Sequence, residues 1–62
     1  MEPKVGQIWQ MDFAHTKEFI FITNVKSNGF QVRYYYLNNP EKTDWDYISS
    51  FMDDLRYKLV SG

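Results

Sequence analysis

The sequence predicts a mainly β protein with one short helical segment, on the basis of three observations. Apolar and polar residues alternate with a period of two through residues 5–11 and 30–37, as in strands with one buried face. The dipeptide Asn28-Gly29 precedes the second of these runs and follows the apolar run 19–25. Asn and Gly tolerate the positive φ angles of hairpin turns, so a hairpin is expected here. One or two helical turns fit best over residues 50–55.

The first expected strand covers residues 5–11 with an interrupted alternation, which places Val5, Trp9 and Met11 on one face and Ile8 on the other. Residues 12–17 are expected to form a loop. The second strand, residues 19–25, is apolar on both of its faces. Such a strand is usually central in its sheet and covered on both sides.

The third expected strand, residues 30–37, alternates between a core-facing set and an outward-facing set of side chains. The core-facing set is Phe30, Val32, Tyr34 and Tyr36, and the outward-facing set is Gln31, Arg33, Tyr35 and Leu37. Residues 38–44 are expected to end this strand and form a loop, and residues 45–48 to form a short fourth strand.

Ser50 is the expected N-cap of a helical turn over residues 50–55, with Asp53 at the third helical position. Phe51, Met52 and Leu55 would share one face of this turn. Residues 57–60 then form a terminal strand, with Tyr57 and Leu59 on the same face.

The alternative is an α+β fold with a three-stranded sheet, in which residues 44–56 form one amphipathic helix. The spacings of three and four that favour it join Trp45, Ile48, Met52 and Leu55.

Sixty-two residues predict a single domain, 1–62. The chain has no cysteine and one histidine, which excludes a disulfide framework and a Cys/His zinc cluster. Its aromatic content of 19% is the expected substitute, because aromatic side chains bury about 150–250 Å² each. No apolar run is long enough for a secretion signal or a membrane span. We therefore expect a soluble cytoplasmic protein without a membrane partner.

The expected order of elements resembles that of an SH3-like barrel, which curls five short strands into two small orthogonal sheets. The chain also resembles small proteins of bacteriophages and mobile elements. That resemblance rests on Gly6-Gln7-Ile8-Trp9, on the strand Val32 to Tyr36 and on the segment Phe51 to Val60. It implies a protein that acts in the host cytoplasm and binds and inhibits a host protein of transcription or defence.

Nothing in the sequence predicts catalysis, a cofactor or a metal ion. His15 stands in the expected loop without a nucleophile or a positioned partner, so it is a solvated side chain in the simplest interpretation. A calcium loop needs oxygen ligands at fixed positions around a central glycine. The clustered carboxylates lack this arrangement; they are Asp44, Asp46, Asp53 and Asp54. We expect no enzyme activity.

Exposed aromatic side chains are the best indication of a binding surface. Trp9, Tyr34 and Tyr36 are expected in the core, whereas Tyr35 is expected to point outward beside Arg33. Residues 38–55 carry five acidic side chains against one lysine, interleaved with aromatic rings. An apolar centre with a charged rim is typical of a protein interface. The candidate partner-binding residues are Arg33, Tyr35, Asp44, Trp45, Asp46, Tyr47, Asp53 and Asp54.

Three other interpretations stay open at this stage. Trp45 and Phe51 could close the barrel while the carboxylates only keep the protein in solution. The aromatic rings could stack on single-stranded nucleic acid, although the basic residues are scattered along the sequence. Edge strands could also pair two copies of the chain into a homodimer.

Overall fold

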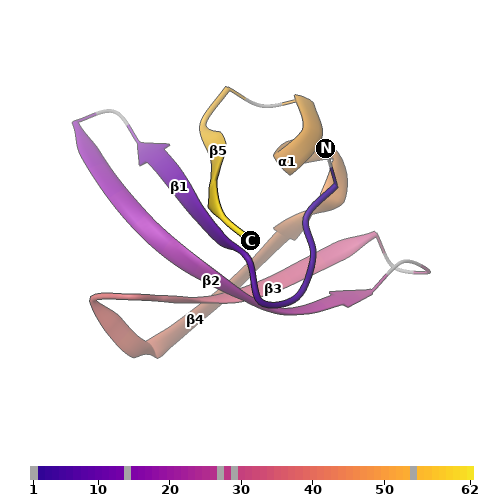
Figure 1. Ribbon diagram of the computed structural model, residues 1–62, viewed down its shortest axis with the longest axis horizontal. Helices are drawn as coiled ribbons and strands as arrows, with labels where there is room; N and C mark the ends of the chain where they lie inside the picture. The colour runs from indigo at the N-terminus through magenta and orange to yellow at the C-terminus, as the bar shows by residue number, and fades with distance from the viewer. Residues whose placement is uncertain (1, 14, 27, 29, 54) are drawn as a thin grey trace.

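The computed structural model describes residues 2–13, 15–26, 28, 30–53 and 55–62, and it places five strands and one helix in them (Figure 1). The elements are β1 (Ile8–Phe13), β2 (Thr16–Lys26), β3 (Gln31–Tyr36), β4 (Asn39–Tyr47), α1 (Ile48–Asp53) and β5 (Tyr57–Ser61). All paired strands are antiparallel, and the order in the sheet is β4-β3-β2-β1-β5. The mainly β class and the short helix before the last strand are confirmed.

The sheet curls because β2 is long and bent. Its eleven residues pair with β1 in the first half and with β3 in the second, and Figure 1 shows it sweeping through the whole molecule. A register shift between Ile22 and Asn24 leaves Thr23 as an extra residue, which is how a β-bulge bends a strand. The strand order and the helix before β5 are those of a small SH3-like barrel. The alternative helix over residues 44–56 is wrong, because β4 extends to Tyr47.

The inner face of the sheet and one side chain of α1 form the core. Phe51 of α1 lies at its centre: its ring stacks on Tyr57 at 4.0 Å and meets Trp9 edge-on at 5.2 Å. The predicted core positions of Trp9, Tyr34 and Tyr36 are confirmed. The buried apolar and aromatic residues are Trp9, Met11, Ile20, Ile22, Val32, Tyr34, Tyr36, Phe51 and Tyr57.

Gln7 closes one end of the barrel as a buried polar residue. Its side-chain oxygen accepts hydrogen bonds from the indole nitrogen of Trp9 at 3.0 Å and from the backbone nitrogen of Lys4 at 2.7 Å. Its side-chain nitrogen donates to the carbonyl of Gly62 at 3.3 Å. The first strand was predicted to begin at residue 5, but Gly6 has φ 92° and turns the chain before β1.

The predicted loops at residues 12–17 and 38–44 are wrong, because the strands continue to pair through most of these polar residues. β1 and β2 stay in register as far as the pair Phe13 and Thr16, so residues 12–17 are mostly strand. β4 likewise begins at Asn39, opposite Tyr36. A register shift takes up residues 40–42, and proline is tolerated there because β4 is an edge strand.

Two predictions about individual faces are also wrong. Phe30 was placed on the core side of a strand, but it precedes β3, has φ 54° and is 67% exposed. β2 is central, as predicted, yet only its inner face is fully covered, because Phe19 is 42% exposed.

The helix begins two residues earlier than predicted. The backbone nitrogen of Ile48 donates to the carbonyl of Phe30 at 2.8 Å, and Ser50 lies inside α1 instead of capping it. A contact with a distant turn therefore sets the start of the helix. Leu55 lies beyond α1 and is 89% exposed, so it is not on a shared buried face with Phe51. The predicted contact of the Asp53 side chain lies outside what the structure describes.

Candidate partner-binding surface

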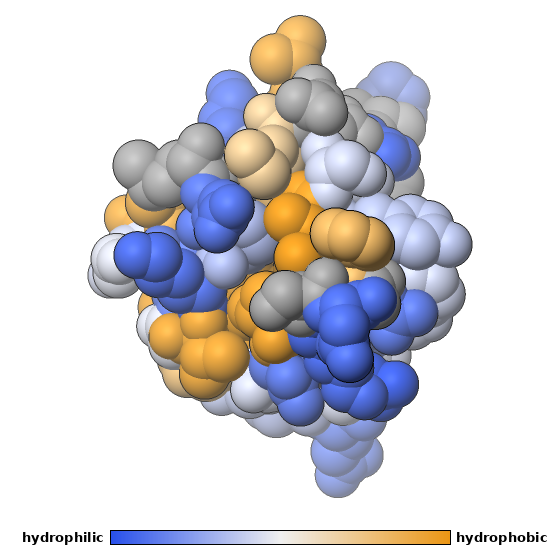
Figure 2. All heavy atoms as spheres, turned by 90° about the vertical axis from the view of Figure 1, so that its right-hand side faces the viewer, coloured by the Kyte–Doolittle hydropathy of each residue, from blue (hydrophilic) through white to orange (hydrophobic). Residues whose placement is uncertain are grey.

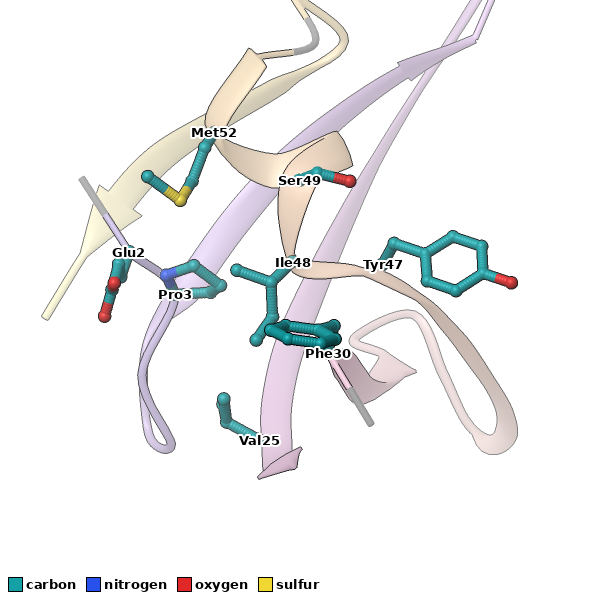
Figure 3. Close-up of a pocket in the computed structure, with 8 residues that line it drawn as sticks. All are labelled: Glu2, Pro3, Val25, Phe30, Tyr47, Ile48, Ser49 and Met52. Atoms are coloured by element: carbon teal, nitrogen blue, oxygen red, sulfur yellow. The ribbon is translucent and has the colours of Figure 1, made fainter. Parts of the chain in front are cut away.

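An apolar groove of about 410 Å³ lies where the β2–β3 turn, the end of β4, α1 and the N-terminal segment meet (Figure 3). We call this site the apolar groove; its lining residues are Glu2, Pro3, Val25, Phe30, Tyr47, Ile48, Ser49 and Met52. In Figure 3 the ring of Phe30 lies against the side chain of Ile48, with Pro3 and Met52 to one side of them. Figure 2 views the molecule from the side of the β2–β3 turn and shows apolar residues gathered in its middle, with hydrophilic residues around them.

Phe30 is held in an unfavourable conformation at the rim of the groove. A positive φ brings the Cβ atom of a residue other than glycine too close to its own backbone, which costs about 1–2 kcal/mol. The hydrogen bond from Ile48 to the Phe30 carbonyl fixes this conformation. The fold thus tolerates strain at a residue whose ring is mostly in solvent.

Trp45 and Tyr47 extend the apolar surface along β4. They are 43% and 51% exposed, and their rings meet edge-on at 5.2 Å. Tyr47 belongs to the apolar groove, while Trp45 lines a second hollow of about 300 Å³. Arg33 lies opposite Trp45 in the register of β3 and β4 and lines the same hollow. The structure therefore brings together three of the predicted partner-binding residues, Arg33, Trp45 and Tyr47.

Asp44 and Asp46 bind backbone amides of β4 itself. β4 is the edge of the sheet, so one set of its alternate amides has no neighbouring strand. The backbone nitrogens of Trp45 and Tyr47, two residues apart, donate to the carboxylates of Asp44 and Asp46 at 2.8 Å and 2.7 Å. This arrangement disfavours the pairing of β4 with a second copy of the chain.

Asp46 also links the two edge strands of the barrel. Its second oxygen accepts a hydrogen bond from the Tyr57 hydroxyl of β5 at 2.7 Å, and Tyr57 is hydrogen-bonded to Tyr34. Burial raises the pKa of Tyr57, and the hydrogen bond to Asp46 raises it further. Burial likewise raises the pKa of Tyr34, with a further increase from Tyr57. Asp46 thus has an internal structural role beside any role in binding.

Tyr35 does not line the apolar groove. Tyr35 points outward, but its ring stacks on Phe21 at 5.2 Å and is half-buried. The side chains of Asp53 and Asp54 lie outside the described part of the structure. Among the described residues, His15 is exposed and no three His, Cys, Asp or Glu side chains gather as a metal site.

Sequence reasoning missed several residues that line the apolar groove, namely Pro3, Val25, Phe30 and Ile48. Strand alternation assigned Phe30 to the core, and nothing in the residue type signals its positive φ. Val25 and Ile48 pack against the core and stay partly exposed. Their apolar side chains alone do not reveal that exposure.

Comparisons with protein-family models, with curated proteins and with solved structures gave no match. Across the described residues, no helix has the length and apolar character to cross a membrane.

Proposed function

We propose that this chain is a non-catalytic module that binds another protein through the apolar groove. The observation that carries the proposal is Phe30, whose ring is 67% exposed on a backbone with φ 54°. A strained residue that exposes an aromatic ring beside a hollow lowers the stability of the free protein. Binding explains such an arrangement, because interfaces concentrate their energy in a few aromatic anchors.

The charge at the groove favours a partner segment with an apolar anchor beside a lysine or arginine, because Glu2 is the charged residue among the described residues that line the groove. A volume of about 410 Å³ is near the lower end of ligand sites, which span about 300–1,000 Å³. It suits a short apolar stretch of a partner protein.

The resemblance to small proteins of bacteriophages and mobile elements supports the further proposal that this partner is a host protein. In that case the chain modulates or inhibits a component of host transcription or defence in the host cytoplasm. The resemblance rests on sequence pattern, and the groove supplies the surface for such an interaction.

The test compares the wild type with Phe30→Gly and, as a control, with Val60→Ala. Glycine relieves the strain at φ 54° and removes the ring, so Phe30→Gly should melt at or above the wild-type temperature. Val60 is 51% exposed on β5 and does not line the groove. Each protein is used to capture partners from nuclease-treated bacterial lysate, and the captured protein is then purified and titrated by calorimetry.

We expect stoichiometric binding of one purified protein by the wild type and by Val60→Ala, and at least about tenfold weaker binding by Phe30→Gly, as for a typical hot-spot residue. If Phe30→Gly binds as tightly as the wild type, the groove is not part of the interface. Capture that disappears with nuclease would overturn the protein-binding proposal.

A further inference from the structure

The outer face of the sheet carries a continuous aromatic surface that the apolar groove does not use. Phe21 of β2 and Tyr35 of β3 are paired in register, and their rings stack at 5.2 Å with an angle of 27° between the planes. Phe19, two residues before Phe21, also points outward and is 42% exposed. Leu37 extends this surface, since its backbone nitrogen donates to the Phe19 carbonyl at 2.9 Å.

Basic residues surround this aromatic surface because of strand alternation. Lys17 precedes Phe19 by two residues, and Arg33 precedes Tyr35 by two, so both lie at outer positions. Four of the seven cationic residues of the chain occupy such positions and are exposed; they are Lys17, Lys26, Arg33 and Lys58. These residues are scattered in the sequence. Strand pairing places Lys17 and Arg33 two residues before Phe19 and Tyr35, and Lys58 pairs with Gln10, which pairs with Phe19, whereas Lys26 lies at the far end of β2 beyond the bulge.

Acidic residues are few on the same face, although the exposed Asp44 lines the same hollow as Arg33. In the described strands, Asp12 is the acidic residue at an outer register position, and it lies opposite Lys17. Its carboxylate accepts a hydrogen bond from the side-chain nitrogen of Gln10 at 2.9 Å. The outer face is therefore positive although the whole chain has a formal charge of −1.

We infer that the outer face binds single-stranded nucleic acid. Unpaired bases stack on aromatic rings while cations neutralise the phosphates, and small β-barrels bind oligonucleotides on a face of their strands. An acidic protein segment would match the cations but leave the rings unused. Two copies of the face would bring Lys17, Arg33 and Lys58 against the same three cations, so charge disfavours a dimer through it.

The experiment measures fluorescence anisotropy of a labelled oligothymidylate and a labelled oligouridylate, each of about 12 nucleotides, and of a DNA duplex of equal length. Titrations run from about 50 to about 200 mM salt, where phosphate contacts lose affinity steeply. We expect binding of the single strands at low salt and much weaker binding of the duplex. No binding at low salt, or equal binding of the duplex, would overturn the inference.

Two matched pairs of substitutions distinguish binding through the outer face from attraction by the net charge of the protein. Lys17→Gln with Lys58→Gln should lower the slope of log binding constant against log salt concentration by about 1 to 2, because each lysine contact to a phosphate contributes about 1 to this slope. Lys4→Gln with Lys42→Gln changes the net charge equally; Lys4 is outside the strands, and Lys42 lies over the Tyr36 ring at 4.8 Å. This control should bind like the wild type. Equal weakening by both pairs would show attraction by charge alone and would overturn the inference.

The rings are tested with Phe19→Leu and Tyr35→Leu together, which keep apolar packing and remove the aromatic planes. Binding of the single strand should weaken at least about fivefold, the lower end for loss of one stacked base. Phe19→Leu alone, at a more exposed ring, serves as the second variant if the pair fails to fold by circular dichroism. Unchanged affinity, or equally tight binding of polyglutamate by the wild type, would assign the face to acidic proteins instead.

Discussion

The inner and outer faces of the sheet use the same residue types in different ways. Inside, Tyr34 and Tyr57 are buried and hydrogen-bonded, and no buried side-chain nitrogen or oxygen among the described residues lacks a partner. Outside, Tyr35 and Phe21 stack on each other and stay partly in solvent. The inner rings hold the fold together, whereas the outer rings provide surface that folding does not require. Mutations on the two faces should therefore separate stability from binding.

The largest expected effect is at Phe51, the ring shared by three core partners. Phe51→Ala removes contacts with Trp9, Tyr34 and Tyr57, and it should cost about 3–5 kcal/mol, enough to unfold a domain of this size. Its neighbour Met52 is half-exposed in the groove, so Met52→Ala should change stability by less than about 1 kcal/mol. Urea denaturation measures both. Similar losses in the two variants would contradict the division between core and surface along α1.

Tyr57→Phe should have the next largest effect. It keeps the ring that stacks on Phe51 but removes the hydroxyl that links Asp46 and Tyr34. Loss of a buried hydrogen-bond partner costs about 1–3 kcal/mol. The matched control is Tyr47→Phe, at an exposed hydroxyl, which should cost almost nothing. A neutral Tyr57→Phe would mean that ring packing alone joins the two edge strands.

The same network predicts a loss of stability in alkaline solution. Burial raises the pKa of Tyr34 and Tyr57 in the folded state, whereas an unfolded tyrosine loses its proton near pH 10. Above about pH 10 the unfolded state binds fewer protons than the folded state, so stability falls by up to about 1.4 kcal/mol per pH unit for each tyrosine. Below pH 10 these groups leave stability unchanged.

Urea titrations of the wild type and Tyr57→Phe between about pH 8 and about pH 11 measure this slope across the tyrosine titration. Lysines titrate in both proteins, so the difference between the two slopes reports the buried hydroxyl. We expect a shallower decline in Tyr57→Phe. Identical slopes would indicate that the tyrosine hydroxyls ionise normally in the folded state.

Strand alternation explains how far the inner and outer faces of the sheet could be predicted from the sequence. The sequence of residues 30–37 correctly predicted Tyr34 and Tyr36 inside and Tyr35 outside, because a period of two follows from strand geometry. The ends of the strands were not predictable in the same way. Residues 39–44 are polar and were predicted as a loop, yet Asn39, Thr43 and Asp44 pair with β3, and a register shift takes up residues 40–42 between them.

The candidate surfaces were predictable only in part. Trp45, Tyr47 and Arg33 follow from exposure in a strand, and the structure places them together. Phe30 depends on a backbone angle, and the positive outer face depends on register across several strands, neither of which local pattern shows. Asp46 has an internal role that its charge did not indicate. Its charge suggested a rim for a partner, while its oxygens bind Tyr47 and Tyr57 within the chain.

The smallest expected effect on stability is at Trp45, which gives the comparison its sharpest test. Trp45→Ala removes a ring that is 43% exposed and contacts Tyr47 at its edge, so we expect a cost below about 1 kcal/mol. Tyr35→Ala should cost more, because its half-buried ring leaves Phe21 without a stacking partner, and such pairs contribute about 0.5–1.5 kcal/mol beyond their buried area. Urea denaturation ranks the two variants. The reverse order would mean that the Trp45–Tyr47 pair stabilises the edge of the barrel. In β4, unlike the rest of the outer face, the same rings would then contribute both to stability and to the binding surface.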